Sequence, residues 1–310
     1  MKKLLSAVAI CSLISPAFAE PVVYGKANVS FQNADENGAS TTELVSNASR
    51  LGFKGNLDVE GGLQAIYQAE FEVNMDDGDE TFTQRNIFVG LKGDFGTVKA
   101  GKFDTPLKEA QKKIDLFNDL EGDIKSMITV NDNRESNVVS YSTPVFGSVV
   151  AKVAYISSES EALDDGISTS VAFEQNGIYV AAAFDQNVEN EDVSVARLVG
   201  QYTISNFQFG ALLETVDSDN LSDNLDGWLL SAKYKMDVWA FNAQYGQSDI
   251  KNLNGNSLSV GVDYKLAKTL KLFSYYTSLE SDDDYDTSED SPGFTSTDSD
   301  YIGVGIELKF

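Results

Sequence analysis

The chain has 310 residues, a formal net charge of −25 at pH 7, and no histidine. This much negative charge argues against nucleic-acid binding, which needs basic residues to replace the counterions of the phosphates. Without histidine there is no Ser-His nucleophile pair and no plausible zinc or other His-ligated metal centre. We therefore expect neither an enzyme nor a cofactor or metal site.

Residues 1–19 have the pattern of a secretory signal peptide: a pair of lysines, an apolar run, and a small-x-small cleavage site at 17–19. The apolar run is shorter than the roughly 17 residues that a membrane-spanning helix needs. Cleavage would also remove Cys11, the single cysteine, so the mature chain could form no disulfide. We expect a signal peptide at 1–19 and one domain at 20–310.

Residues 63–73 show a clear strand pattern, because apolar and polar residues alternate along the segment. A period of two places the apolar side chains on one face of a β-strand and the polar ones, among them Glu70 and Glu72, on the other. Segments 227–236 and 257–266 repeat the pattern further along the chain. A soluble sandwich would show the same alternation in any one strand, so this pattern alone does not decide the fold class.

Residues 107–126 carry the one helical pattern. Apolar residues recur there at the three- and four-residue steps of one helix face: Leu107, Ala110, Ile114, Phe117 and Ile124. Thr105 can cap the start, Pro106 suits the first helical position, and Gly122 can end the helix. The sequence therefore predicts a helix inside a long connection at 104–134.

Near the end of the chain, Asp282, Asp284 and Asp286 lie at alternate positions, as in a calcium-binding loop. The sixth and twelfth positions are Thr287 and Gly293, where such a loop needs glycine and glutamate. A solvated acidic loop is the preferred interpretation, and we assign no metal site to it.

Short and long connections alternate along the chain. The short ones include 93–96 and 176–177. The long ones are acidic and rich in Ser, Asn and Asp, and they lie near 33–47, 76–81, 104–134, 157–166, 187–192, 216–226, 247–255 and 279–298. About sixteen strands of bilayer-crossing length separate them, and the last one ends on Phe310. Tight turns at one rim and long loops at the other predict an all-β fold, a transmembrane antiparallel β-barrel of about sixteen strands.

Such a barrel reverses the usual arrangement of a soluble protein. A closed sheet pairs every backbone donor and acceptor without leaving an edge, which the hydrocarbon of a membrane requires. The apolar faces then point outward to lipid and the polar faces inward to water. At about sixteen strands the interior is too wide for side chains to fill, so it holds an aqueous channel.

Several segments resemble the general (diffusion) porins of Gram-negative outer membranes. They are VVYGKANVSF after the predicted signal, SRLGFKGNLDVEGGLQAIYQAEFE, RNIFVGLKGDFGTVKAGKFDTP, SNVVSYSTPVFG and the terminal phenylalanine. The resemblance covers the whole chain after the signal, and it implies a trimer of sixteen-stranded barrels in the outer membrane. It also implies that the third extracellular loop, here 104–134, folds into the pore as a constriction.

The same resemblance implies which charges face each other across the constriction. By motif match the basic side is Lys26, Arg50, Arg85, Lys102 and Arg134, and the acidic loop side is Asp115, Asp119, Glu121 and Asp123. Lys26 and Arg50 also lie on the polar faces of their own strands, independently of the family pattern. The strand phase of Arg85 is ambiguous, and Lys102 stands where the family often has arginine. We expect the apolar side of the loop to pack against the inner wall.

Acids that face bases across a narrow pore produce a transverse field that orders water and dipolar solutes. We therefore expect an outer-membrane porin, a water-filled channel for passive diffusion of small hydrophilic solutes and ions, with a preference for cations because of its negative charge. The expected partners are outer-membrane lipids, lipopolysaccharide and further copies of the chain in a homotrimer. Two alternatives stay open: a channel specific for a sugar or an amino acid, and a surface adhesin or phage-receptor barrel that acts through its acidic loops.

Overall fold

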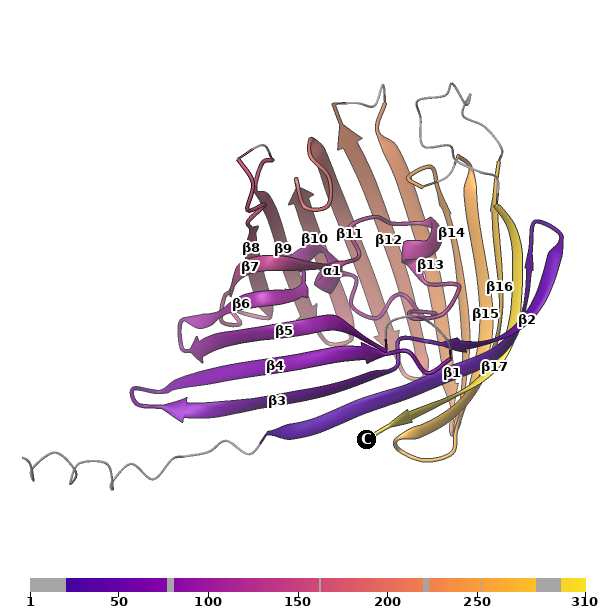
Figure 1. Ribbon diagram of the computed structural model, residues 1–310, viewed down its shortest axis with the longest axis horizontal. Coiled ribbons are helices and arrows are strands. Elements are labelled where there is room, and N and C mark those ends of the chain that lie inside the picture. The colour runs from indigo at the N-terminus through magenta and orange to yellow at the C-terminus, as the bar shows by residue number, and fades with distance from the viewer. Residues whose placement is uncertain (1–20, 77–80, 162, 220–222, 252, 283–296) are drawn as a thin grey trace, which may run out of the picture.

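The computed structural model describes residues 21–76, 81–161, 163–219, 223–251, 253–282 and 297–310. The predicted signal peptide at 1–19 lies outside the described residues, as does most of the acidic segment that begins at Asp282. Within the described part, β-strands make up almost all of the regular structure (Figure 1).

The strands are β1 (Val22–Glu36), β2 (Ala39–Ser46), β3 (Arg50–Val59), β4 (Leu63–Val73), β5 (Phe82–Gly93), β6 (Gly96–Asp104), β7 (Arg134–Ser142), β8 (Val149–Ile156), β9 (Gly166–Gln175), β10 (Ile178–Gln186), β11 (Val193–Ile204), β12 (Phe207–Ser218), β13 (Leu225–Met236), β14 (Trp239–Ser248), β15 (Gly255–Lys265), β16 (Leu270–Ser281) and β17 (Thr297–Lys309). Two short helices, α1 (Pro106–Ala110) and α2 (Ile124–Met127), lie between β6 and β7. Among the described residues, no helix is long and apolar enough to cross a membrane.

Each wall strand pairs antiparallel with the next, and β17 pairs with β1, so the sheet closes on itself. β2 and β3 are two lengths of one wall strand, because β1 pairs with β3 along its first half and with β2 along its second. The interruption between them contains Ala48, which has a φ of 46°. Counted in this way the wall has sixteen strands, which confirms the predicted fold class (Figure 1).

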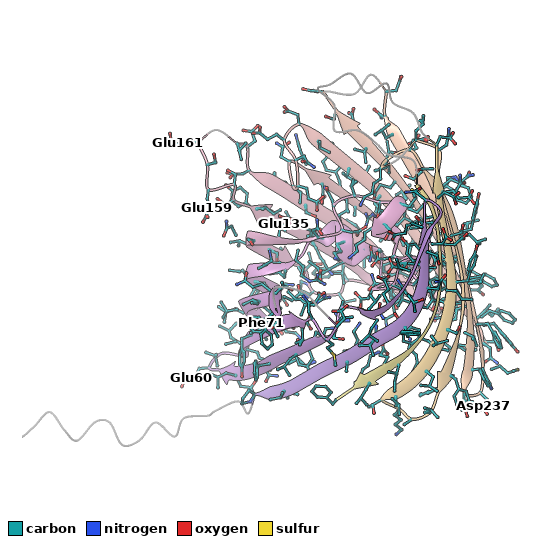
Figure 2. All side chains as sticks on the ribbon, turned by 45° about the vertical axis from the view of Figure 1, so that its right-hand side comes forward. Glu60, Phe71, Glu135, Glu159, Glu161 and Asp237 are labelled. Atoms are coloured by element: carbon teal, nitrogen blue, oxygen red, sulfur yellow. The ribbon has the colours of Figure 1, made fainter. Side chains whose placement is uncertain are left out.

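The two rims of the barrel differ in the length of their connections. Tight turns such as 176–177 join strands at one rim, and longer connections such as 157–165 join them at the other. Figure 2 shows Glu60 and Asp237 at the rim of the tight turns and Glu159 at the opposite rim. The layout that the sequence predicts is therefore present.

The first connection is not the long loop predicted at 33–47. β1 and β2 continue to a tight turn of Asn37 and Gly38, whose φ angles are 53° and 81°. Asn-Gly favours two-residue hairpins because both residues tolerate positive φ. The polar residues on either side resemble a loop in composition, yet they pair in register along β1 and β2.

The wall is apolar on the outside and polar on the inside. On β13, Leu230 is 55% exposed, whereas its neighbour Ser231 is 6% exposed. On β15, Leu258 is exposed and Ser259 is buried. Both strands have the faces predicted from their alternation, and the apolar side chains point away from the barrel interior.

The segment between β6 and β7, residues 105–133, turns into the barrel, and we name it the inward loop (Figure 1). α1 packs beside β9 and β10, and α2 lies beside β15. As predicted, α1 begins at Pro106, and Thr105 caps it by accepting a hydrogen bond from the backbone N–H of Lys108 at 3.2 Å.

A short helix is present in the loop as predicted, but no single helix runs through 107–126. The chain leaves the helical conformation after α1 and returns to it only for the four residues of α2. Lys112 and Asp119 have φ angles of 52° and 69°, which a right-handed helix cannot contain. Gly122 does not end a helix; a Cβ there would lie 2.1 Å from Ser259 Oγ, so glycine lets the loop backbone lie against β15.

The apolar residues that produced the helical pattern are all buried: Leu107, Ala110, Ile114, Phe117 and Ile124. Two of them pack against glycines of the inner wall. A Cβ at Gly210 of β12 would lie 2.9 Å from Ile114 Cβ, and one at Gly261 of β15 would lie 3.0 Å from Phe117 Cε1. The two glycines therefore make room for the loop, and the apolar side of the loop packs against the inner wall as expected.

Candidate pore constriction

A polar cavity of about 520 Å³ lies between the inward loop and the wall strands β2 to β7. Its basic lining residues come from both the wall and the loop: Arg50, Arg85, Arg134, Lys108, Lys112 and Lys125. Its acidic lining residues are Glu72, Asp104, Glu109, Asp119, Glu121, Asp123 and Asp132. Among the described residues, no aromatic side chain lines this cavity. Charges of both signs thus surround the space that the loop leaves open.

Asp119 joins the inward loop to the basic side of the wall. Its Oδ2 atom lies 2.6 Å from Lys26 Nζ on β1 and 3.2 Å from Arg50 Nη2 on β3. Burial acts to raise the pKa of Asp119, but the charges of Lys26 and Arg50 outweigh burial and bring the pKa below its ordinary value. Asp119 therefore stays ionised at neutral pH, and three of the residues predicted from the sequence form one ion cluster.

Arg85 lies inside the barrel, which resolves its ambiguous strand phase. Its Nε atom is 3.0 Å from Glu70 Oε1, and its Nη1 atom contacts Glu72, both on the neighbouring strand β4. The register of β4 against β5 shifts between Ala69 and Phe71, where a β-bulge adds a residue to β5. A bulge interrupts the period of two. The alternation before the bulge and the alternation after it therefore predict opposite faces of the strand for the same residue.

Arg134 and Lys102 have different surroundings. Arg134 lines the 520 Å³ cavity, and its Nε atom is 3.3 Å from Asp104 Oδ1. Lys102 lines a second cavity, of about 620 Å³, together with Glu135, and its Nζ donates a hydrogen bond to Ser136 Oγ at 3.2 Å. The structure therefore does not bring Lys102 together with Lys26, Arg50 and Arg85.

Glu121 and Asp123 line the cavity from the loop side. Glu121 Oε1 accepts a hydrogen bond from Gln32 Nε2 at 2.9 Å. Burial raises the pKa of Glu121, and the hydrogen bond from Gln32 acts in the opposite direction. Asp123 caps α2 by accepting a hydrogen bond from the backbone N–H of Lys125 at 3.0 Å, and burial raises its pKa as well.

Asp115 was predicted to face the channel, but in the structure it is buried and does not line the 520 Å³ cavity. It accepts hydrogen bonds from the backbone N–H groups of Phe117 and Ile124, at 3.1 and 3.3 Å, and from Gln244 Nε2 at 3.3 Å. Burial, and then the charge of Asp123, raise its pKa well above the ordinary value. Asp115 therefore fixes the shape of the loop and ties it to β14.

Two of the acids that accompany the wall bases are glutamates of β4, Glu70 and Glu72, which were not among the predicted site residues. Glu70 and Glu72 contact Arg85, and Glu70 Oε1 also lies 4.0 Å from Arg50 Nη1. The other carboxylate oxygen of Glu70, Oε2, accepts a hydrogen bond from Tyr24 OH at 3.0 Å. Both glutamates lie on the predicted polar face of 63–73, so the alternation was enough to predict that their side chains point into the barrel. Their arginine partners depend on the register between strands, which alternation within one strand does not contain.

Comparison with known proteins gives a family match over most of the chain. A family model described as Gram-negative porin matches residues 6–284. The major outer membrane protein P.IB of Neisseria sicca is 32% identical over 169 residues, which are 50% of this chain and 47% of that protein. The protein of the same name from Neisseria meningitidis serogroup B is 26% identical over 253 residues, 72% of this chain and 73% of that protein. The match thus spans about half the length of the Neisseria sicca protein and 73% of the length of the Neisseria meningitidis protein.

Solved structures share the fold. The anion-selective porin from Comamonas acidovorans matches with a TM-score of 0.77 at 21% identity, over 94% of this chain and 100% of that one. The trimer form of in-vitro folded OmpT, an outer membrane protein of Vibrio cholerae, matches with a TM-score of 0.71 at 18% identity, over 94% of this chain and 99% of that one. At these identities the likeness shows the fold alone.

Proposed function

The chain belongs to the Gram-negative porin family and is a protein of the outer membrane, and on that premise we propose that it forms a water-filled channel for passive diffusion of small hydrophilic solutes and ions. A sixteen-stranded barrel has an interior too wide for wall side chains to fill. The inward loop occupies part of that interior. We therefore take the 520 Å³ cavity beside the loop as the narrowest level of the channel.

The observation that carries this proposal is the meeting of Asp119 with Lys26 and Arg50 beside the cavity. This contact holds the loop against the basic wall, and the polar cavity beside it has the wall arginines Arg85 and Arg134 on one side and the loop acids Glu121 and Asp123 on the other. Opposite charges across a low-dielectric opening produce a focused transverse field. Polar solutes and water align in such a field, whereas an apolar solute must displace the aligned water. The arrangement therefore favours passage of hydrophilic solutes.

We further propose that the channel prefers cations. Each wall base contacts an acid: Lys26 and Arg50 contact Asp119, Arg85 contacts Glu70 and Glu72, and Arg134 contacts Asp104. Among the described residues, two acids of the lining, Glu121 and Asp123, have no ion pair, against one such base, Lys125, so the unpaired charge of the lining is negative. Carboxylates without a paired base raise the local concentration of cations. The Comamonas porin is described as anion-selective, but the likeness to it concerns the fold and not the charges of the channel.

The lining also supports a general channel over one specific for a sugar. A sugar-specific channel needs aromatic side chains along its path, since sugars stack on them, and the described lining of the cavity contains none. Most of its lining consists of charged and amide side chains.

The assembly that we propose is a homotrimer surrounded by outer-membrane lipids and lipopolysaccharide. Support comes from family membership and from the trimer form of the Vibrio cholerae protein with the same fold. The outward apolar side chains of the wall, such as Leu230, suit either lipid or a neighbouring barrel. Native mass spectrometry of the detergent-extracted protein should give three times the mass of one chain; a monomer alone would contradict the trimer.

Planar bilayers test the proposed function. The purified protein should form open channels, and a KCl gradient should give a reversal potential on the side of K⁺. Channels with a reversal potential on the side of Cl⁻ would contradict the cation preference and leave the channel itself intact. A folded protein that gives no conductance would contradict the function as a whole.

A further inference from the structure

One buried side chain, Arg197 of β11, connects the inward loop to the wall. Its side chain has 0% exposure, so it does not reach the water of the channel. It also does not line the 520 Å³ cavity. A guanidinium carries five N–H donors in a rigid plane. In this structure, all five have acceptors.

The acceptors of Arg197 come from several parts of the chain. Its Nε atom donates to Glu214 Oε2 at 2.5 Å. Its Nη1 atom donates to Asp132 Oδ1 at 3.0 Å and to Gln111 Oε1 at 3.4 Å. Its Nη2 atom donates to the carbonyl oxygen of Val130 at 3.1 Å and to Asp132 Oδ2 at 3.2 Å. The bond to Asp132 is bidentate, which adds both strength and a fixed orientation.

These acceptors lie at both ends of the inward loop. Gln111 directly follows α1, near the start of the loop, whereas Val130 and Asp132 lie near its end. Glu214 belongs to wall strand β12 and also accepts a hydrogen bond from the backbone N–H of Val130 at 2.8 Å. A single guanidinium therefore fastens the two ends of the loop to each other and to the wall.

Removing the guanidinium would leave two buried carboxylates, Glu214 and Asp132, without their opposite charge. Such groups are strongly unfavourable away from water unless they are paired. Asp132 belongs to the loop and lies beside the cavity, so it could regain water if the end of the loop moved. Lysine would restore the charge, but its ammonium is a compact point charge with three donors and cannot reproduce the planar five-donor arrangement.

We propose that Arg197 is a positioning residue, which clasps both ends of the inward loop and thereby holds the constriction at one width; this rests on the proposed channel function. It acts through the loop backbone and not through its own charge on passing ions. Loss of the clasp should therefore change the steadiness of the open channel more than its ion preference.

The test is single-channel recording of Arg197→Gln in planar bilayers, with folding checked by circular dichroism and by the change in gel mobility on heating. We expect the steady open level to break into several levels, with the time at the main level falling by at least about half, because the unpaired carboxylates drive the loop end toward water. The reversal potential in a KCl gradient should stay near the wild-type value. Arg197→Lys should give an intermediate result.

Arg50→Gln is the matched control, because it removes an arginine that does line the cavity. It should shift the reversal potential while the open level stays steady. A folded Arg197→Gln variant with wild-type recordings would overturn the proposal. So would a reversal potential that shifts in Arg197→Gln and returns completely to the wild-type value in Arg197→Lys, because the charge of Arg197 would then act on the passing ions. If Arg197→Gln does not fold, Gln111→Leu removes only the tie to the start of the loop and should show the same unsteadiness to a smaller degree; steady recordings would then overturn it. Wild-type protein without channels would refute the channel function instead.

Discussion

The two halves of the inner wall contact the inward loop through different chemistry. From β9 to β15, which we name the seat, most contacts are apolar packing and hydrogen bonds: Ser168 Oγ accepts from the backbone N–H of Leu107 at 3.1 Å, and Tyr179 OH donates to the carbonyl oxygen of Ala110 at 2.8 Å. This side also has ion pairs to the loop, and the main one is the buried pair of Arg197 with Asp132. From β1 to β7, which we name the charged side, the loop approaches through ion pairs, chiefly that of Asp119 with Lys26 and Arg50.

This difference separates two tasks. Close packing and satisfied hydrogen bonds hold a loop in one place, because any displacement loses many contacts together. Charges beside a polar cavity act on water and ions without filling the space. The seat therefore fixes the position of the loop, and the charged side gives the remaining opening its electrical character.

The largest effect is expected from the seat, where Phe117 is 2% exposed against the wall. Phe117→Ala should destabilise the protein by about 3–5 kcal/mol, because it leaves a cavity where the ring packed. Thermal unfolding followed by circular dichroism measures the loss. Phe117→Leu fills most of the same space and should cost clearly less. Equal unfolding temperatures for wild type and Phe117→Ala would show that the loop is not held by this packing.

On the charged side, Asp119→Asn should change the ion preference of the channel and have little effect on the unfolding temperature of the protein. It leaves Lys26 and Arg50 without their loop partner, so the K⁺/Cl⁻ permeability ratio should fall by at least about threefold. Reversal potentials in a KCl gradient measure the ratio. Asp115→Asn makes the same chemical change away from the cavity and should shift it much less; equal shifts for the two variants would contradict the division.

A smaller effect is expected from pH. Burial raises the pKa of Glu121 above its ordinary value of 4.5, so this residue loses its charge earlier than an exposed glutamate as the pH falls. Asp119, with a pKa below 3.8, keeps its charge over the same range. Asp123 also lines the cavity, and burial raises its pKa as well, so both acids lose charge as the pH falls. The cation preference should decline over this range, and Glu121→Gln should remove the part that is due to Glu121. A pH response unchanged in Glu121→Gln would assign the titration to another group.

The smallest effect is expected from Lys102→Gln, because Lys102 lines the second cavity and not the constriction. Its charge is therefore not part of the lining that we propose to select ions, and the shift in reversal potential should be clearly smaller than that in Asp119→Asn. A shift as large as that of Asp119→Asn would mean that the second cavity also controls ion passage.

The alternation of apolar and polar residues predicted the faces of the strands, and the alternation of short and long connections between about sixteen such strands predicted the barrel. Neither pattern could determine what neighbouring strands bring together. The phase of Arg85 was hidden by a bulge, and the partners of Glu70 depend on register. The Asn37 and Gly38 pair did carry a hairpin signal, and polar composition around it obscured that signal.

The inward loop shows the same limit for helices. Spacing of three and four residues predicted a helix within 107–126, yet these residues pack against the wall from two short helices and the turns between them. Ile114 and Phe117 meet wall glycines, and the chain turns at Lys112 and Asp119. Asp115 was assigned to the channel with the other loop acids because its sequence context is equally acidic. Only the folded loop shows that backbone N–H groups surround it.

Cysteine labelling tests most directly whether the loop is seated on one half of the wall and leaves the passage on the other. The chain has a single cysteine, Cys11, inside the predicted signal peptide, so engineered cysteines would be the only thiols after cleavage. Ser126→Cys lies exposed beside the 520 Å³ cavity, and Ser259→Cys lies fully buried beneath Gly122 of the loop. A charged thiol reagent added to open channels should react with Ser126→Cys and reduce the conductance, while Ser259→Cys stays unreactive. Rapid reaction at Ser259→Cys, or none at Ser126→Cys, would contradict this arrangement.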